Sequence, residues 1–454
     1  MELIRAIHQM IWGPWTLALF LGTGIWFTIR SKAFQIRGFS VWWRETAGSF
    51  LAEKEEKTGK ITPFQSACTA LAATIGTGNI VGVATALSAG GPGALFWMWI
   101  SALIGMITAY AETSLGQKYR YRKKDGHWMC GPMVYMERGL GCRAMGLLYA
   151  VFAVLCSLGM GSMVQSNSMS GTLSYSAGIP GWLSGVLITA LVGAVILGGV
   201  GRIARVSERL MPVSAGIYML FSTVVILSCS DELPAVFGSI FHEAFKLRAA
   251  AGGTAGFVLS QSIRYGLSRG VFSNEAGLGS LAVLHGAAED TTPEKQGMWA
   301  VFEVFFDTIV VCTMTALVIL CICQTQGGGL PAGYDGAALT SYCFARRLGR
   351  MGEILVSGAM VIFAFATIIA WYYLGRQTAA YLLGSLSSNE RIRRGGERIY
   401  LMLYLLAVYI GCVGRLEVVW LISDIWNGLM AYPNILALLL LSGEVRYPER
   451  EISS

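Results

Sequence analysis

The sequence predicts an all-α polytopic membrane protein with about eleven transmembrane helices. Three observations lead to this class. Of the 454 residues, 54% are hydrophobic and 13% are charged, whereas a soluble globular chain usually has about 25% charged residues. The mean hydropathy is +0.56, and apolar runs close to the length of a membrane span recur along the whole chain. Two of these runs are interrupted by glycine and polar residues.

Eleven apolar runs are the candidate spans. They cover residues 11–29, 63–89, 93–117, 144–171, 181–200, 210–230, 253–283, 298–323, 351–375, 399–413 and 418–442. The first is too long for the core of a cleavable signal peptide, so we interpret it as a helix that stays in the membrane. The chain is then one transmembrane domain over residues 1–454, with a peripheral first helix (11–30), a five-helix repeat (63–230) and a second five-helix repeat (253–442).

The distribution of Lys and Arg gives the orientation. With the N-terminus outside, 25 of the 34 Lys and Arg residues fall on the cytoplasmic side and 7 on the other side. This asymmetry is the positive-inside rule, and it places the C-terminus in the cytoplasm. The net charge of +7 is therefore an insertion signal, and it does not indicate a nucleic-acid partner. The ten cysteines form neither a disulfide framework nor a metal-binding pattern.

Two runs contain clusters that weaken a helix at membrane depth. Residues 75–79 read IGTGN, and residues 268–275 read SRGVFSNE. Glycine loses much entropy in a helix, and asparagine bonds to its own backbone. Backbone groups freed in this way must be buried in protein or line a cavity. Each cluster opens a run of five spans, and five is odd, so the two runs cross the membrane in opposite directions. This is the pattern of an inverted-repeat secondary transporter. Simple close packing of helices is the alternative, which we prefer for Gly82, Gly90, Gly105 and Gly358.

Enzymatic motifs are missing from the sequence: it has no zinc-protease motif, nucleophile elbow or Walker A loop. We therefore expect no enzyme, and any transport must use an existing ion gradient. The four histidines, His8, His127, His242 and His285, are far apart in sequence. We expect each of them to be solvated or interfacial.

The groups near the interruptions suit a small zwitterion and a cation. Free N–H groups at a helix break attract a carboxylate, and Thr77 and Gly78 would supply them. Unwound carbonyls and hydroxyls are hard oxygen ligands for Na⁺, and the candidates are Ala72, Ile75 and Thr367. Gln165 either contacts the substrate or bonds to a neighbouring helix, and Trp371 either walls a pocket or lies at the membrane interface.

Four ionisable residues fall inside apolar spans, where such residues are usually functional or paired. They are Arg269, Glu275, Glu303 and Asp307. Arg269 and Glu275 are close enough in sequence to pair across the second interruption. We prefer this structural lock to a direct contact with substrate.

Several stretches resemble the alanine/glycine:cation symporter family. They are FQSACTALAATIGTGNIVGVATA (64–86), GGPGA (90–94), FWMW (96–99), YAE (110–112), KYR (118–120), GPM (131–133), ERGLG (137–141), RGVFSNEAG (269–277), FAFATII (363–369) and Trp371. The chain departs from the family's pattern at Ala109, Cys130 and Ser162, where Lys, Gly and Asn are common.

The resemblance implies a leucine-transporter-type fold with two broken helices, and symport of small neutral amino acids such as alanine and glycine with Na⁺ or H⁺ in a bacterial plasma membrane. The implied sodium ligands are Ala72, Ile75 and Thr367. The implied substrate-binding residues are Thr77, Gly78, Asn79, Gln165, Gly270, Phe272, Ser273 and Trp371. A channel or sensor on the same helices stays open as an alternative, as do the choice between Na⁺ and H⁺, the preferred substrate and the oligomeric state.

Overall fold

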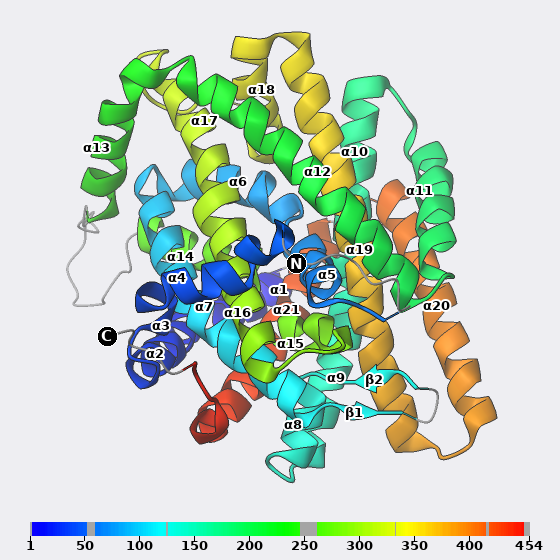
Figure 1. Cartoon of the computed structure of the whole chain (residues 1–454). Helices are drawn as coiled ribbons and strands as arrows, with labels where there is room; N and C mark the ends of the chain where they lie inside the picture. Colours follow the sequence, from blue (N-terminus) through cyan, green and yellow to red (C-terminus); the bar gives the residue numbers. More distant parts are fainter. Residues whose placement is uncertain are drawn as a thin grey trace.

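The computed structural model describes residues 2–51, 60–123, 126–245, 261–331, 333–414 and 417–448. In this part of the chain, helices form one bundle with a single two-stranded antiparallel hairpin at one end (Figure 1). The hairpin joins β1 (Tyr121–Arg122) to β2 (Trp128–Met129), with Tyr121 opposite Met129.

The helices of the first half follow the predicted spans with short additions between them. In chain order they are α1 (Glu2–Ile11), α2 (Pro14–Arg30), α3 (Phe34–Arg37), α4 (Phe39–Glu45), η1 (Ala47–Leu51), α5 (Pro63–Thr74), η2 (Thr77–Asn79), α6 (Val81–Gly90), α7 (Gly93–Tyr119), α8 (Pro132–Arg138), α9 (Arg143–Leu158), η3 (Gly159–Val164), α10 (Gln165–Ala177), α11 (Gly181–Ile196), α12 (Val200–Leu227), η4 (Ser230–Glu232) and α13 (Leu233–Ala244).

The second half has the same character. Its helices are α14 (Gln261–Asn274), α15 (Ser280–Leu284), η5 (His285–Ala287), α16 (Pro293–Val304), η6 (Phe305–Cys312), α17 (Thr313–Gln324), α18 (Gly336–Leu348), α19 (Arg350–Leu386), α20 (Glu390–Val413), α21 (Glu417–Leu440) and η7 (Ser442–Glu444). The segments η3 and η6 are π-helical, and each lies within a longer apolar helix.

Each predicted span coincides with one or more helices, except that residues 253–260 of the seventh lie outside the described residues. Among the described residues, seven helices are long and apolar enough to cross a membrane, and the bent pair α5–α6 makes an eighth. The exact number of eleven spans stays a prediction.

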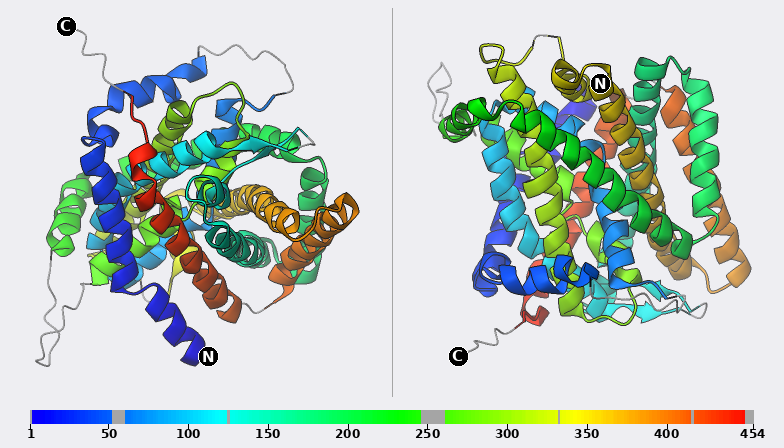
Figure 2. Two further views of the ribbon diagram at one scale, coloured as in Figure 1. Left: turned by 90° about the horizontal axis from the view of Figure 1, so that it is seen from below. Right: turned by 45° about the horizontal axis from the view of Figure 1, so that its top comes forward.

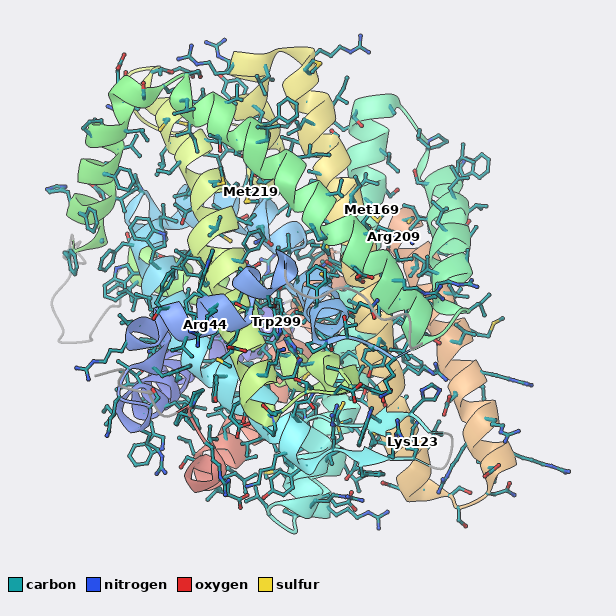
Figure 3. All side chains as sticks on the ribbon, viewed as in Figure 1. Arg44, Lys123, Met169, Arg209, Met219 and Trp299 are labelled. Carbon is teal, nitrogen blue, oxygen red and sulfur yellow. The ribbon has the colours of Figure 1, made fainter. Side chains whose placement is uncertain are left out.

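Two of the basic segments lie at one end of the bundle. The β1–β2 hairpin and the turn between α19 and α20 both lie at the lower end in Figure 1, and Figure 3 places Lys123 there. This is the end that the charge distribution assigns to the cytoplasm. Figure 2 shows α1 and α2 along the outside of the bundle, where α2 packs on α7, so the first predicted helix is peripheral.

The first broken helix begins with a strong cap. The Thr62 side chain accepts a hydrogen bond from the Gln65 amide (3.1 Å), the Gln65 side chain accepts one from the Thr62 amide (3.2 Å), and Pro63 occupies the first turn. The helix stops after Thr74, because Ile75 and Gly76 leave the helical region. The two halves, α5 and η2–α6, are bent by 57°.

The second break begins only at Glu275, the last residue of the predicted cluster, which corrects the sequence expectation. Residues 268–274 are helical and end α14. The chain then takes left-handed backbone angles at Glu275 (φ 55°), Gly277 (φ 89°) and Gly279 (φ 85°) before α15 begins. Glycine tolerates such angles, so the two glycines after the cluster set the break.

Both breaks are in the core of the bundle. All residues from 66 to 80 and from 270 to 288 are buried. The long helix α7 packs against α14 and α16, and α19 packs against α5 and α10. Backbone groups freed at the breaks therefore face protein, as a structure within a membrane requires.

Candidate functional site

Asparagine 79 organises the first break. Its side-chain oxygen accepts a hydrogen bond from the Gly76 amide at 3.1 Å. In a continuous helix that amide would donate to the carbonyl of Ala72, so Asn79 releases the Ala72 carbonyl from the helical ladder. The Thr77 hydroxyl, in the same turn, is buried and has no hydrogen-bond partner in the described structure.

Aspartate 307 connects the two broken helices. It lies in the π-helical segment η6, where its carboxylate accepts hydrogen bonds from Asn79 Nδ2 (2.7 Å), Ser273 Oγ (2.8 Å) and Thr308 Oγ1 (2.8 Å). The sequence singles out Asp307 as an ionisable residue in an apolar span, but sequence reasoning did not place it at the site. π-Helical segments often occur at functional sites, and this one turns Asp307 toward both breaks.

Two of the three proposed sodium ligands, Thr367 and Ala72, are in contact. The Thr367 hydroxyl of α19 donates to the carbonyl oxygen of Ala72 at 2.9 Å and to that of Phe363 at 3.0 Å. A Cβ atom added to Gly76 would lie 2.6 Å from Thr367 Oγ1. Thr367 is thus in direct contact with the end of α5, next to the buried residue Ile75.

Two further groups of candidate residues surround the first break. A Cβ atom added to Gly78 would lie 3.5 Å from Ser273 Cα and 3.7 Å from Phe272 Cδ1. One added to Gly76 would lie 3.6 Å from Gln165 Oε1. Residues of both broken helices and of α10 therefore face the same region.

Tryptophan 371 joins this region from α19. It is fully buried, and a Cβ atom at Gly161 of η3 would lie 2.5 Å from Trp371 Cβ. Gln165 follows η3 directly, so one π-helical segment positions both side chains. This burial argues against the interfacial alternative for Trp371.

Two buried polar atoms in these residues, Thr77 Oγ1 and Gln165 Oε1, have no hydrogen-bond partner in the described structure, whereas the Trp371 side chain lies beside the Glu275 carboxyl. Buried polar groups are almost always paired, and an unpaired group requires an explanation. A hydroxyl both donates and accepts hydrogen bonds, and an amide oxygen accepts them. The arrangement is suited to a small polar guest.

Glycine 270 does not belong to this region. It lies within α14, and a Cβ atom there would lie 2.7 Å from Ser101 Oγ and 3.4 Å from Met98 Cα of α7. Its lack of a side chain allows α14 to approach α7 closely, so we remove it from the substrate-binding residues and assign it to helix packing.

The predicted lock between Arg269 and Glu275 is wrong. No ion pair joins these two residues, and the Arg269 guanidinium lies over the Phe272 ring, 5.6 Å from its centroid. The left-handed conformation of Glu275 ends the helix between them, so the two side chains do not share a helix face.

The expectation for His285 is also wrong. Its side chain is fully buried and contacts the equally buried Glu303 of α16. His8, His127 and His242 are half-buried or exposed, in line with the expectation. His285 follows α15 directly, and the packing of η5 against α5 and α7 covers it.

Two broken helices in an inverted repeat, with a buried polar region between their breaks, define a membrane transporter of the leucine-transporter-type fold. The chain belongs to the sodium:alanine symporter family, whose model matches residues 1–450. This is a family of transporters and not of enzymes.

Several known proteins are similar over nearly the whole chain. It is 42% identical to an uncharacterized transporter of Haemophilus influenzae (96% of this chain, 93% of the relative). It is 38% identical to the sodium/alanine symporter AgcS of Methanococcus maripaludis (98% and 95%), and 36% identical to a probable sodium/glutamine symporter of Bacillus subtilis (97% and 88%).

Solved structures support the fold. A Na⁺-coupled sialic acid symporter matches with a TM-score of 0.60 and 14% identity, over 96% of this chain and 86% of that protein. MhsT, solved in complex with L-phenylalanine, matches with a TM-score of 0.53 and 14% identity, over 87% and 100%.

Proposed function

We propose that this protein takes up small neutral amino acids, alanine and glycine, together with Na⁺ by alternating access. The observation that carries the proposal is the presence of two unpaired buried polar atoms, Thr77 Oγ1 and Gln165 Oε1, beside the first break. An amino acid bound there would supply the missing donors and acceptors.

The substrate carboxylate would bind at the first break. The amides of Thr77 and Gly78 begin a new helical segment, and helix N-termini attract anions. Phe272 and Ser273 would flank the substrate from the second broken helix, 3.5–3.7 Å from the position of a Cβ atom on Gly78. Phe272, Trp371 and Gln165 would leave room for a side chain no larger than a methyl or hydroxymethyl group, because a close-packed wall rejects larger groups sterically.

The sodium ion would bind between α5 and α19. Its ligands would be the carbonyl oxygens of Ala72 and Ile75 and the hydroxyl of Thr367. In the described structure the Thr367 hydroxyl donates to Ala72 O, and on ion binding both oxygens would turn to the cation. Ion and substrate then stabilise the same conformation of the first broken helix, so each raises the affinity for the other by the same factor.

Uptake into proteoliposomes tests the proposal. Purified protein is reconstituted, and a sodium gradient or a proton gradient is imposed separately while radiolabelled alanine and glycine are measured. We expect saturable uptake with the sodium gradient and competition by serine, but not by leucine or glutamine. Uptake with the proton gradient alone would make the proton the coupling ion. Flux that does not saturate would indicate a channel, and absence of flux would indicate a sensor.

We also propose that the N-terminus faces the outside and the C-terminus the cytoplasm of a bacterial plasma membrane. The support is the position of the β1–β2 hairpin and of the turn between α19 and α20, both basic, at one end of the bundle (Figure 1).

A further inference from the structure

A basic groove lies between the turn that joins α11 to α12 and the antiparallel pair α19–α20, in the half of the bundle predicted to be cytoplasmic. Its volume is about 510 Å³, and its described lining includes three arginines, Arg376, Arg394 and Arg398, and one carboxylate, Glu397. The lower end of α12 lies beside α19 (Figure 1), and α11 packs against both α19 and α20. None of the described residues that line the groove belongs to the proposed substrate or sodium sites, so the groove is a separate feature.

Arginine 398 is the arginine of this groove that lacks an acceptor. Arg376 pairs with Glu397 at 3.2 Å. Arg394 pairs with Glu390 at 3.0 Å. Arg398 is exposed on α20, and its guanidinium takes part in no hydrogen bond or ion pair within the described part of the chain. A guanidinium offers five N–H donors, so the groove presents a positive charge with unused donors.

The start of α12 adds backbone donors to the groove. The helix follows Gly199, which has a left-handed backbone (φ 72°) and no side-chain cap. The first amides of a helix have no partner inside it, and among the described residues no carbonyl accepts from the amides of Val200 and Gly201. Both residues line the groove. The N-terminus of a 28-residue helix therefore favours an anion at this place.

Tyrosine 372 supplies a polar group from a buried side chain. The residue is only 4% exposed, because its ring packs on the rings of Tyr400 and Tyr404, with centroids 5.9 Å and 5.2 Å away. It nevertheless lines the groove, and its hydroxyl makes no hydrogen bond to any described residue. Buried polar groups are normally paired, so this hydroxyl indicates a partner from outside the chain.

The outer surface next to the groove is apolar. The helices α11 and α20 pack against each other. Four large apolar side chains on or just after these helices are 60–68% exposed: Leu191, Leu197, Ile399 and Met402. Leu197 also lines the groove. Residues 390–398 are mostly charged and residues 399–413 mostly apolar, so the groove lies at the level where the apolar surface of α20 ends, which is the level of lipid headgroups.

A neighbouring hollow of about 490 Å³ lacks this combination. It shares Arg394 and Glu397 with the groove. Three further arginines line it, and each already donates to an acceptor of the protein at 2.7–3.0 Å: Arg122, Arg143 and Arg393. We therefore assign the anion to the groove that contains Arg398.

We propose that this groove binds the phosphate of an anionic phospholipid of the cytoplasmic leaflet. The donors would be the guanidinium of Arg398, the hydroxyl of Tyr372 and the amides at the start of α12. Hydrogen bonds from arginine to phosphate are charge-assisted, and basic pockets between transmembrane helices on the cytoplasmic side suit such headgroups. The acyl chains would lie along α11 and α20. A free phosphate ion would use the same donors but not the apolar surface, so the lipid fits both features. The inference does not depend on the proposed substrate or coupling ion.

Lipid binding to the purified full-length protein tests the proposal. Delipidated protein in detergent is titrated with phosphatidylglycerol, and phosphatidylcholine with the same acyl chains serves as the zwitterionic control. Native mass spectrometry counts the bound lipids. We expect phosphatidylglycerol to bind at concentrations at which phosphatidylcholine does not. Arg398→Gln should weaken phosphatidylglycerol binding roughly fivefold, and Tyr372→Phe should weaken it while the ring contacts remain.

Two variants of matched charge serve as controls. Arg391 is exposed on the same helix but is not among the described residues that line the groove. Arg391→Gln removes the same charge and should bind phosphatidylglycerol as the wild type does. Arg398→Lys keeps the charge and should retain most of the binding. Thermal unfolding in detergent confirms that each variant is folded.

Three results would overturn the proposal. The first is equal binding of the two lipids by the wild type. The second is an equal loss of phosphatidylglycerol binding in Arg391→Gln and Arg398→Gln, which would indicate a general effect of surface charge. The third is displacement of phosphatidylglycerol by an excess of inorganic phosphate at constant ionic strength, which would make a soluble anion the occupant.

Discussion

Thr367 Oγ1 and the carbonyl oxygen of Ala72 are 2.9 Å apart, although 295 residues separate them in the chain. The contact joins α19 to the end of the first half of the first broken helix. It is available because the Gly76 amide donates to Asn79 Oδ1 and not to Ala72. Asn79 thereby leaves the carbonyl oxygen of Ala72 without a hydrogen-bond donor from its own helix.

Removing the Thr367 hydroxyl should weaken sodium binding specifically. Thr367→Val keeps the shape but removes one oxygen ligand. The sodium concentration for half-maximal uptake should rise much more than the alanine concentration for half-maximal uptake at saturating sodium. Thr378→Val is the matched control, because Thr378 is buried in the same helix and its hydroxyl bonds only to Leu374 and Gly375 of its own turn. An unchanged sodium dependence in Thr367→Val would place the ion elsewhere.

A methyl group at Gly76 should abolish most transport. The added Cβ would lie 2.6 Å from Thr367 Oγ1, so the Thr367 hydroxyl must leave its contact with Ala72 or one of the two helices, α5 or α19, must move. Overpacking a buried contact costs about 1–3 kcal/mol, which corresponds to a loss of roughly five- to 150-fold in initial uptake rate. Gly82→Ala is the control, since no atom lies within 4 Å of its added Cβ. Equal activity of the two variants would contradict the close contact.

Replacement of Asp307 by Asn should weaken the hydrogen bonds that join the two broken helices. The asparagine would present an N–H₂ group where the carboxylate now accepts from Asn79, Ser273 and Thr308. An unmet buried hydrogen bond costs about 1–3 kcal/mol, so alanine affinity should fall by roughly five- to 150-fold. Isothermal binding measurements on purified protein would detect this change, and a wild-type affinity would show that Asp307 has no part in the site.

Substitution by alanine should have different effects at Gly78 and at Gly270. Gly78→Ala makes only ordinary contacts with Ser273 and Phe272, so the protein should fold normally, while the narrower site raises the alanine concentration for half-maximal uptake. Gly270→Ala forces Ser101 away from α14, so thermal stability should fall while that concentration stays close to the wild-type value. The opposite pattern would indicate that Gly270 is part of the substrate site. Thermal unfolding and uptake, measured side by side, distinguish the two cases.

Chemical labelling of a single exposed cysteine tests the orientation of the chain in the membrane. Cys142 is exposed and the other nine cysteines are buried. It lies in the loop predicted to be cytoplasmic, so a membrane-impermeant maleimide should label inside-out vesicles and not intact cells. Cys142→Ser should remove the label. Labelling of intact cells would reverse the proposed topology.

The sequence by itself determined the helices and the first break. The length of an apolar run decides whether a segment can span the membrane, and glycine and asparagine lower the stability of a helix where they occur. Both properties depend only on residues that are neighbours in the chain. Residues 75–79 therefore break the helix where predicted. Of the residues that the family resemblance assigns to the sodium site, Thr367 and Ala72 are in contact, and the ion site itself stays a prediction.

Only the tertiary structure decided which distant residues share a site. Asp307 contacts Asn79 across 228 residues, Gly270 faces α7, and His285 is buried against Glu303. The second break begins at Glu275, which has the first of three left-handed backbone angles, and Gly277 and Gly279 have the other two. Each outcome depends on how helices pack, and packing is a property of surfaces brought together from remote parts of the chain, which no local pattern contains.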